Sequence, residues 1–302
     1  MTSVERRQLA EIALTHGRHT FQPCLFRNSD GSEKCIKKGG ICSLRLYEDC
    51  GDGSAVPVID VEGDLRTVCP QRFKQDGIIY KAIGERILKT SEPKVVSEIR
   101  FLRRFRNESF KMGDDKDSNS IKKTAREDVG NIDNVLVHPK ELPMKWCALE
   151  IQAVYFSGMS MNHMFSHIKQ SSSKGIPFPD AVRRPDYRSS GPKRLMPQLQ
   201  IKVPTLRRWG KKMAVVVDEG FYRSLGEMDT VSDLSNSDIA WFVIRYDENG
   251  DIAKLIVDEP KKQTLECAVE GLTGGLPVSL GEFEAKIREK INQTLRKQRR
   301  NR

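Results

Sequence analysis

The sequence predicts an α/β fold in which helices flank a mixed central β-sheet, with a small, metal-stapled region at its N-terminal end. From Ile78 onward, helical patterns alternate with strand-like runs of β-branched and aromatic residues. Five of the seven cysteines lie in the first quarter of the chain, where long apolar stretches are few. We therefore expect an N-terminal region over 1–77 and a core domain over 78–302.

The charge balance favours an anionic partner. Lys and Arg exceed Asp and Glu by 51 to 41, which gives a formal net charge of +10 and suits nucleic acid or another polyanion. No apolar run has the length of a signal peptide or a membrane span, so we expect a cytoplasmic protein without a membrane partner. Cysteines in such a chain argue against a disulfide framework.

The elements of the first half can be placed in order. They are a helix over 80–90, a strand over 94–102 with Glu98 near its centre, an exposed loop over 107–128, and two adjacent antiparallel strands over 130–139 and 145–156. The turn-like PKELPM at 139–144 separates the last two strands. This pair of strands is the most regular part of the sequence.

The second half continues the alternation. Its elements are a helix over 160–170, a loop over 171–194, an ambiguous segment over 199–210, a buried strand over 214–218, a short helix over 221–225, a hairpin over 241–260 and an amphipathic helix over 282–302. The loop carries proline and arginine, so it is a candidate DNA-facing arm. Asp218 and Glu219 are expected to cap the short helix rather than to act in catalysis.

The two central strands carry the most informative acids. Asp133 lies on the first, and Glu150 and Gln152 share one face of the second because strand side chains alternate. Two adjacent carboxylates need a cation between them to stay ionised, and oxygen ligands of this kind suit Mg²⁺, with the Ile151 carbonyl as a further ligand. Such a site would activate water and attack a phosphodiester.

A plainer interpretation of these residues stays open. Asp133 would then be a turn residue at a strand end, and the Glu-Ile-Gln pattern an ordinary solvent-facing row. Glu98 has the same two interpretations, as an additional acid of the site or as a solvent-facing strand residue, and the second is favoured. Short acidic motifs are common, so their context must decide.

The cysteines admit two interpretations as well. Cys24, Cys35, Cys42 and Cys69 could bind zinc or iron in a closed, structural four-thiolate site, with Cys50 as an additional thiol. Their spacing is not that of a zinc ribbon, so scattered thiols are an equal alternative.

Basic residues are dense between 183 and 212 and suggest a surface that follows DNA phosphates. They are Arg183, Arg184, Arg188, Lys193, Arg194, Arg207, Arg208, Lys211 and Lys212. His163 and His167 stand one helical turn apart but have no obvious third metal ligand nearby. They could instead contact phosphate or base edges.

The arrangement of Asp133, Glu150 and Gln152 resembles the PD-(D/E)xK nuclease superfamily. In that motif an Asp precedes a second strand that carries an acid, an apolar residue and a polar residue, and the polar residue is usually lysine. Here it is Gln152, which carries no charge. The segments WCALEIQAVYFSGMSMNH, NIDNVLV, QPCLF, EKCIKKGGIC and TVCPQRF together resemble the NotI-type type II restriction endonucleases. The glutamine is a feature of that family, and the similarity spans about Phe21 to Leu225, with weaker similarity through AWFVIRYD.

This resemblance implies the roles of single residues. Asp133 and Glu150 would bind the catalytic Mg²⁺, and Gln152 would position water or phosphate. Cys24, Cys35, Cys42 and Cys69 would hold a structural metal, iron in the family, while Cys50 has no obvious counterpart and puts the fourth ligand in doubt. The fold expected is a restriction-endonuclease-like core.

The expected function is Mg²⁺-dependent cleavage of double-stranded DNA at a specific site, palindromic if the enzyme is a homodimer. A cognate DNA methyltransferase is then expected in the host. The alternatives are a non-catalytic nucleic-acid-binding protein, in which the cysteine site and basic loops act alone, and a repair nuclease of low sequence specificity. Metal-dependent cleavage into discrete fragments distinguishes the first expectation from both.

Overall fold

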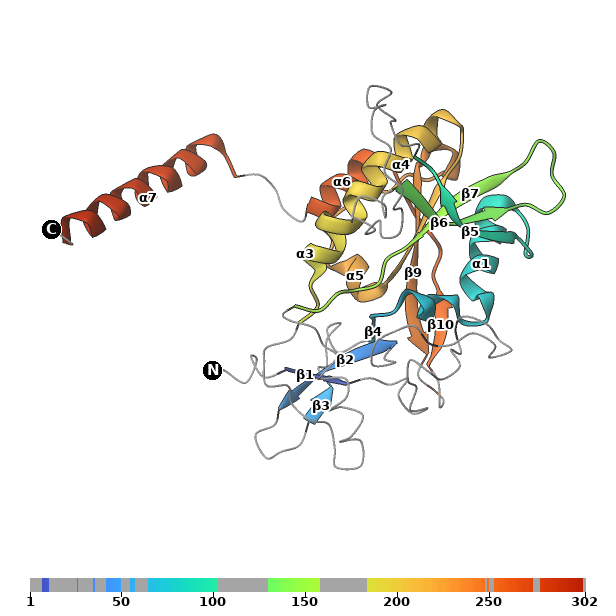
Figure 1. The fold of residues 1–302 in the computed structure, drawn as a ribbon, viewed down its shortest axis with the longest axis horizontal. Coiled ribbons are helices and arrows are strands. Elements are labelled where there is room, and N and C mark those ends of the chain that lie inside the picture. The colour runs from blue at the N-terminus through green and yellow to red at the C-terminus, as the bar shows by residue number, and fades with distance from the viewer. Residues whose placement is uncertain are drawn as a thin grey trace, which may run out of the picture.

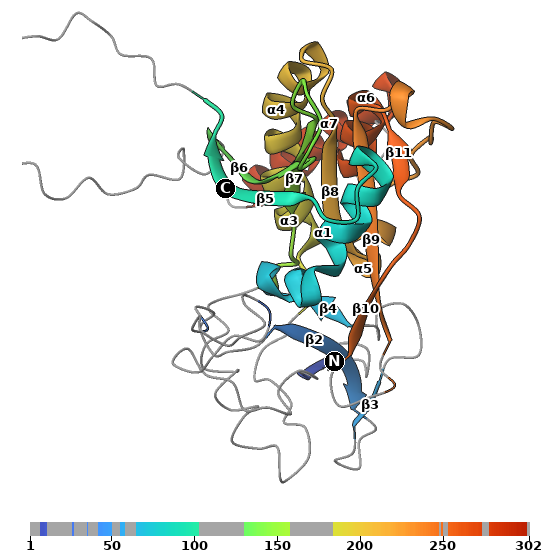
Figure 2. The same cartoon turned by 90° about the vertical axis from the view of Figure 1, so that its right-hand side faces the viewer.

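The computed structural model describes residues 7–10, 26, 35, 42–49, 55–57, 65–102, 130–157, 184–247, 249, 253–273 and 278–300. Within these residues, seven strands form one mixed sheet in the order β10–β9–β8–β7–β6–β5, with β11 pairing with β9 (Figures 1 and 2). The strands are β5 (Lys94–Arg100), β6 (Asn131–Val137), β7 (Trp146–Ile151), β8 (Met213–Asp218), β9 (Ile239–Asp247), β10 (Lys254–Val257) and β11 (Lys261–Gln263). The predicted mixed sheet is confirmed.

The sheet is parallel in its middle and antiparallel at its edges. β7 pairs with β8, and β8 with β9, in parallel. The hairpin of β6 and β7 and the pairing of β5 with β6 are antiparallel, as are those of β10 and β11 with β9. Every residue of β8 is buried, as expected for a strand covered on both faces.

Helices cover both faces of the sheet and make three layers (Figure 2). One face packs against η5 (Pro70–Gly77), α1 (Ile78–Ile83) and η6 (Gly84–Leu88), whose Ile79, Ile83 and Ile87 join a core cluster with alternate residues of β7, β8 and β9. The other face packs against α4 (Met196–Arg208), α5 (Glu219–Arg223) and α6 (Leu265–Thr273). Trp241 of β9 is fully buried there.

The predicted loop over 171–194 is wrong in its described part. Tyr187–Ser190 forms α3, Gly191–Leu195 continues it as η8, and α4 follows without a break. Asp186 caps this run, because its carboxylate accepts a hydrogen bond from the Ser189 N–H. The Ser, Gly and Pro residues of this segment suggested a loop. The helix is held against the core because Leu195 is buried there.

The ambiguous segment over 199–210 is helical as far as Arg208, where α4 ends, and its last two residues form a turn. Pro197 lies near the start of α4, where the run passes from the wider turns of η8 into the α-helix, and Pro204 lies inside the helix. Leu199, Val203 and Leu206 bury one stripe of this helix against the sheet. Apolar burial therefore outweighs the unfavourable interior proline.

The N-terminal region contains strands where a loop-rich, metal-ordered segment was expected. β1 (Arg7–Ala10), β2 (Ser43–Asp49), β3 (Ala55–Pro57) and β4 (Arg66–Thr67) pair around β2. The Val154 N–H donates to the Thr67 carbonyl at 2.8 Å, which joins this region to the core. The division of the chain at residue 77 stays a prediction.

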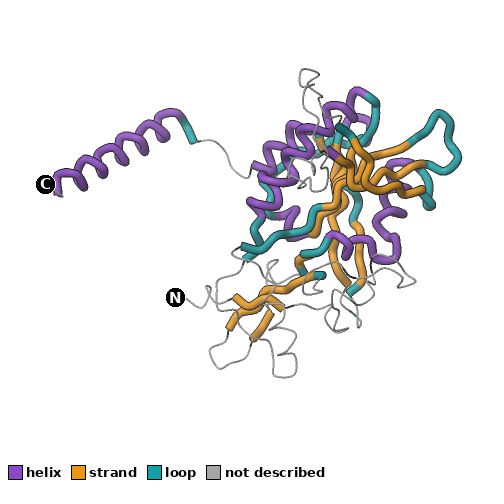
Figure 3. The backbone as a smooth tube through the Cα atoms, viewed as in Figure 1, coloured by secondary structure: helices purple, strands orange, loops and turns teal. Residues whose placement is uncertain are grey.

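The amphipathic helix predicted near the C-terminal end is present. α7 (Leu280–Arg300) extends away from the three layers in Figures 1 and 3. Its Leu280, Phe283, Ile287 and Ile291 are spaced three to four residues apart and are 45–74% exposed. Among the described helices, none combines the length and apolarity that crossing a membrane would require.

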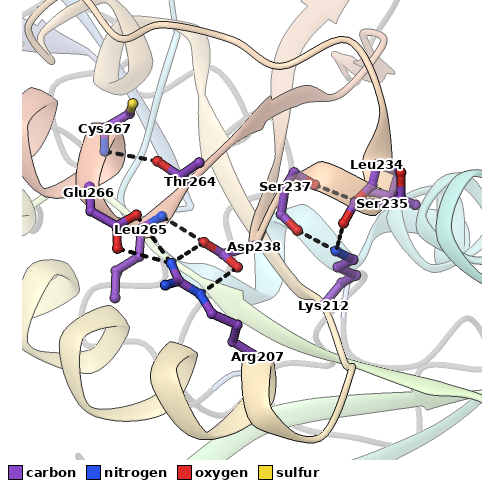
Figure 4. A network of polar contacts seen from close by, with 10 residues as sticks. All are labelled: Arg207, Lys212, Leu234, Ser235, Ser237, Asp238, Thr264, Leu265, Glu266 and Cys267. Carbon is purple, nitrogen blue, oxygen red and sulfur yellow. Dashed lines mark hydrogen bonds and ion pairs between the residues drawn. The ribbon is translucent and has the colours of Figure 1, made fainter.

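An ion-pair network fastens the end of α4 to the start of β9 (Figure 4). Arg207 pairs with Asp238 and with Glu266 of α6. Lys212 donates to the backbone carbonyls of Ser235 and Ser237. These two basic residues, which the sequence suggested for DNA contact, are thus engaged within the fold.

Asp218 caps α5, as predicted, and also holds β4. Its Oδ1 accepts from the Phe221 N–H and its Oδ2 from the Thr67 N–H, both at 2.8 Å. We expect Asp218→Ala to lower the free energy of unfolding by roughly 2–4 kcal/mol, because two buried N–H groups lose their acceptor. Urea denaturation measures this. The exposed Asp233→Ala serves as the control, and an equal, small effect of both substitutions would contradict the prediction.

Candidate active site

Asp133 and Glu150 lie opposite each other where β6 and β7 end their pairing. The last pair of the ladder is Asn134 with Leu149, so the next position in register brings the two acids together. They continue to interact beyond the ladder, because the Asp133 Oδ2 accepts a hydrogen bond from the Ile151 N–H at 3.2 Å. The two acids predicted from the sequence therefore meet in the structure.

Glu150 is buried, with 2% of its surface exposed. Its Oε1 accepts a hydrogen bond from the Lys202 Nζ at 2.5 Å. Burial, reinforced by the neighbouring Asp133 charge, raises the pKa of Glu150 to about 8, although the Lys202 charge opposes the shift. Without a further cation, this carboxyl group holds its proton near neutral pH.

Asp133 is half buried and responds to the same surroundings. Burial raises the pKa of Asp133, while the hydrogen bond from Ile151 and the charge of Lys202 lower it. Glu98 raises this pKa further and the half-buried Lys74 lowers it, so both charges lie near Asp133. The centre thus combines acids with at least two lysines.

Glu98 occupies the same row of the sheet as the two central acids. The pairs Ser97 with Asn134 and Ile99 with Ile132 place it opposite Asp133 in the register of β5 and β6. Its φ of 56° lies in the left-handed region, which non-glycine residues seldom adopt and which costs on the order of 1 kcal/mol. Glu98 is exposed, as the favoured interpretation expected, yet it also adds negative charge beside Asp133.

Gln152 lies one residue beyond β7 and is half buried. Its backbone N–H donates to the Val216 carbonyl at 3.0 Å, which continues the pairing with β8. Its side-chain Nε2 donates to the Ala153 carbonyl at 2.6 Å. Gln152 thus follows Glu150 by two residues, and the backbone of Ala153 engages its side-chain amide.

Lys202 is the residue of this centre that the sequence did not reveal. It lies on α4 among Leu199, Val203 and Leu206, and its side chain is fully buried. A lone lysine on the apolar stripe of a helix was the available signal. The two prolines of the segment obscured the helix, and with it the stripe.

The donor set of the pair fits Mg²⁺. Carboxylate oxygens are the ligands this cation prefers, and proteins commonly hold it through one or two carboxylates together with substrate phosphates. Among the described residues, no group of three or more His, Cys, Asp or Glu side chains is arranged to hold a metal ion. Two carboxylates alone do not fill the coordination of Mg²⁺, so a phosphate or water would have to complete it.

Three of the four predicted cysteine ligands gather in the N-terminal region. Cys35, Cys42 and Cys69 are buried in one cluster with Phe26, and the Cys69 N–H donates to the Cys42 carbonyl at 3.1 Å. They are not arranged as a metal-binding group, so the expected metal-stapled region is not supported. Cys24 and Cys50 lie outside the described residues.

The predicted DNA-facing arm is described only from Arg184 onward. His163, His167 and Arg183 lie outside the described residues. Arg194 stacks on the exposed Tyr155, with its guanidinium carbon 3.9 Å from the ring centroid. Of the basic residues predicted to follow DNA phosphates, six described ones are exposed: Arg184, Arg188, Lys193, Arg194, Arg207 and Arg208.

A comparison with protein families identifies the family of the chain. Residues 4–256 match the family described as Restriction endonuclease NotI, a span that contains Glu98, Asp133, Glu150 and Lys202 and ends before α7. None of the curated protein sequences compared with the chain matches it. The family cleaves DNA at specific sites, so the chain is a site-specific deoxyribonuclease and binds double-stranded DNA. The matched segment covers most of the sequence, and the chain therefore belongs to the NotI restriction endonuclease family.

Proposed function

We propose that the protein hydrolyses DNA phosphodiester bonds with Mg²⁺ bound between Asp133 and Glu150, in the manner of the PD-(D/E)xK nucleases. The observation that carries this proposal is the meeting of the buried Glu150 carboxylate with the half-buried Asp133 carboxylate at the end of the β6–β7 ladder. Burying two adjacent acids is unfavourable unless a cation compensates them. A metal-binding role gives a reason for this costly arrangement.

The ligands of the Mg²⁺ would be the two carboxylates and the backbone carbonyl of Ile151. When bound, the cation supplies an activated water and neutralises charge that develops on the phosphodiester. Asp133 and Glu150 would fix its place at the end of the β6–β7 ladder, inside the sheet. Glu98 adds negative charge on the exposed side of the same row, where a second ion or the attacking water could be held.

Gln152 would orient water or phosphate through its amide. It has no charge and exchanges no proton, so its contribution is limited to hydrogen bonds. To reach a substrate, its Nε2 must exchange the Ala153 carbonyl for the ligand. The residue thus positions a group and does not transfer a proton.

The test is a cleavage assay. Purified protein is incubated with unmethylated DNA of phage length, with Mg²⁺ or with a chelator, and the products are separated on a gel. Discrete fragments that require Mg²⁺ are expected, and sequencing of their ends gives the recognition site. Smeared products would favour a nuclease of low specificity, and fragments that form equally well in chelator would overturn the metal dependence.

We also propose that the recognition site is palindromic and is read by a homodimer, because two-fold symmetry of the protein matches two-fold symmetry of the site. The exposed apolar stripe of α7 supports a contact with a second copy of the chain. The enzyme would act in the cytoplasm of a host that protects its own DNA with a cognate methyltransferase.

Replacing two apolar residues of α7 tests the dimer. We expect Phe283→Gln with Ile287→Gln to shift the protein from dimer to monomer in sedimentation, while the core keeps its melting temperature. Replacing the exposed polar Glu284 and Arg288 by Gln on the same helix is the matched control and should leave the dimer intact. A wild-type chain that sediments as a monomer at micromolar concentration would contradict the proposal.

For the N-terminal cysteines, we propose the structural iron or zinc site that the family resemblance implies, with Cys24 or Cys50 completing the cluster of Cys35, Cys42 and Cys69. The burial of three thiols in one cluster supports it. A four-thiolate site would have a structural role, since it leaves no open position for chemistry.

Metal analysis of the purified protein tests this site. We expect close to one iron or zinc per chain, lost together with much of the thermal stability in Cys69→Ser, because a bound metal stabilises the folded state. Cys267→Ser, at a half-buried thiol of α6, should keep the metal. Wild-type protein that is free of metal and equally stable after chelation would contradict the proposal.

A further inference from the structure

We infer that Lys202 is a positioning residue of the nuclease centre, which fixes the Glu150 carboxylate as a metal ligand and supplies the positive charge that Gln152 cannot. This inference rests on the proposed function of the same site. The lysine that such nucleases usually carry on this strand is replaced by Gln152. The helix α4, which packs on one face of the sheet, provides Lys202 instead.

The geometry fixes both groups. The Lys202 Nζ donates to the Glu150 Oε1 at 2.5 Å and also to the Gln198 Oε1, one turn earlier on α4. The side chains of Lys202 and Glu150 are 0% and 3% exposed. With two acceptors and no solvent access, the ammonium group can hold one oxygen of the Glu150 carboxylate in place and leave the second oxygen for a metal ion.

The surroundings make a lysine at this position costly unless it has such a task. Leu199, Val203 and Leu206 continue the apolar stripe of α4 on either side of it. A leucine or methionine would complete the stripe without burying a charge, and replacing buried ion pairs by apolar residues is often neutral or stabilising. The pair with Glu150 therefore points to a role in the site rather than in packing.

The charge of Lys202 acts on both acids of the pair. It interacts favourably with Asp133 as well as with Glu150, against the repulsion between the two carboxylates. Because Lys202 is fully buried, we assign it no contact with substrate. Lys202 acts through Glu150. Residues that hydrogen-bond to a metal ligand commonly set the orientation of that ligand.

The test compares Lys202→Met with Lys212→Met. Methionine keeps the length and apolar contacts of lysine, and Lys212 is likewise held by the fold but binds only the carbonyls of Ser235 and Ser237. We expect Lys202→Met to raise the Mg²⁺ concentration for half-maximal single-turnover cleavage, or to lower the saturated rate, by about 10- to 100-fold. DNA affinity measured with Ca²⁺ should change less than about twofold, and Lys212→Met should resemble wild type.

Calorimetric titration with Mn²⁺ gives a readout besides activity. A weaker Mn²⁺ affinity of Lys202→Met by a similar factor supports the inference even if wild-type protein proves not to cleave, an outcome that would overturn only the proposed function. If Lys202→Met does not fold, Gln198→Met is measured in its place. This variant keeps the Lys202 charge but removes the second acceptor of its ammonium group, so a weaker Mn²⁺ affinity is again expected. Unchanged Mg²⁺ and Mn²⁺ dependence together with a lower melting temperature would show a structural role only and overturn the inference.

A second lysine provides the competing explanation. Lys74 also lies near Asp133, from η5 on the opposite face of the sheet. If Lys74→Met alters the metal dependence while Lys202→Met leaves it unchanged, the charge is supplied by Lys74 and the assignment of Lys202 is wrong.

Discussion

Asp133→Asn is expected to reduce DNA cleavage by about 10³-fold or more while DNA binding persists. The substitution keeps the shape of the side chain and can still accept from the Ile151 N–H, so the strands stay in place. It removes one of the two carboxylates that would bind Mg²⁺, and a metal supplies several kcal/mol of charge stabilisation in the transition state. Single-turnover cleavage measures the first effect, and a gel-shift assay with Ca²⁺ the second.

The matched control for this substitution is Asp229→Asn, at an exposed aspartate between α5 and β9. It should cleave at the wild-type rate. Cleavage within tenfold of wild type by Asp133→Asn would show that this acid is not a ligand of the catalytic metal, and would direct attention to Glu98.

The metal-free protein is expected to lose stability as the pH rises from about 4.5 to about 8. Glu150 has an ordinary pKa of 4.5 when unfolded and a pKa of about 8 in the fold, so the folded state binds the extra proton across this window. Stability is then fully present below the unfolded pKa and is lost as the pH rises through the folded pKa. The loss is on the order of a few kcal/mol.

Urea denaturation at a series of pH values in the presence of chelator measures this slope. Glu150→Gln should flatten most of it, and a smaller slope from Asp133, whose pKa is also raised, should persist. The exposed Glu227→Gln should keep the full slope. Mg²⁺ binds the ionised acids and competes with the proton, so its addition at pH 8 should restore stability. A wild-type slope in Glu150→Gln would show that another group is responsible.

The sequence predicts the centre well where the signal is local. Alternation along 145–156 places Glu150 on one face, and the short turn before it makes an antiparallel hairpin with the Asp133 strand the natural pairing. Strand patterns therefore suffice to bring the two acids together, and β6 and β7 confirm the pairing. The capping role of Asp218 was also predictable, because an acid directly before a short helix is a common helix start.

The rest depends on contacts between distant segments. Lys202 is 52 residues from Glu150 in the chain, and only the packing of α4 on the sheet brings them together. The row position of Glu98 depends on the register of β5 with β6 across a connection of about 30 residues, which no local pattern fixes. β11 and α6 were not predicted, since each follows directly on the hairpin without a clear change in pattern.

In the N-terminal region, the sequence suggested a feature that the structure does not support. The concentration of cysteines in a segment with few apolar stretches, together with the family resemblance, suggested a loop stapled by metal, whereas strands pair around β2 and reach the core through Thr67. Cysteine is also a small apolar residue that packs well, so clustering of Cys35, Cys42 and Cys69 with Phe26 has a second explanation. Spacing alone does not distinguish these two uses of a thiol.

The most direct test of the central claim locates the metal. Crystals of the protein with a duplex that contains its recognition site are soaked briefly with Mn²⁺, and an anomalous difference map is calculated. We expect a peak bound by the carboxylates of Asp133 and Glu150 beside the phosphate that is cut, with the Lys202 Nζ on the far side of Glu150. A peak held by other residues, with no density between Asp133 and Glu150, would contradict it.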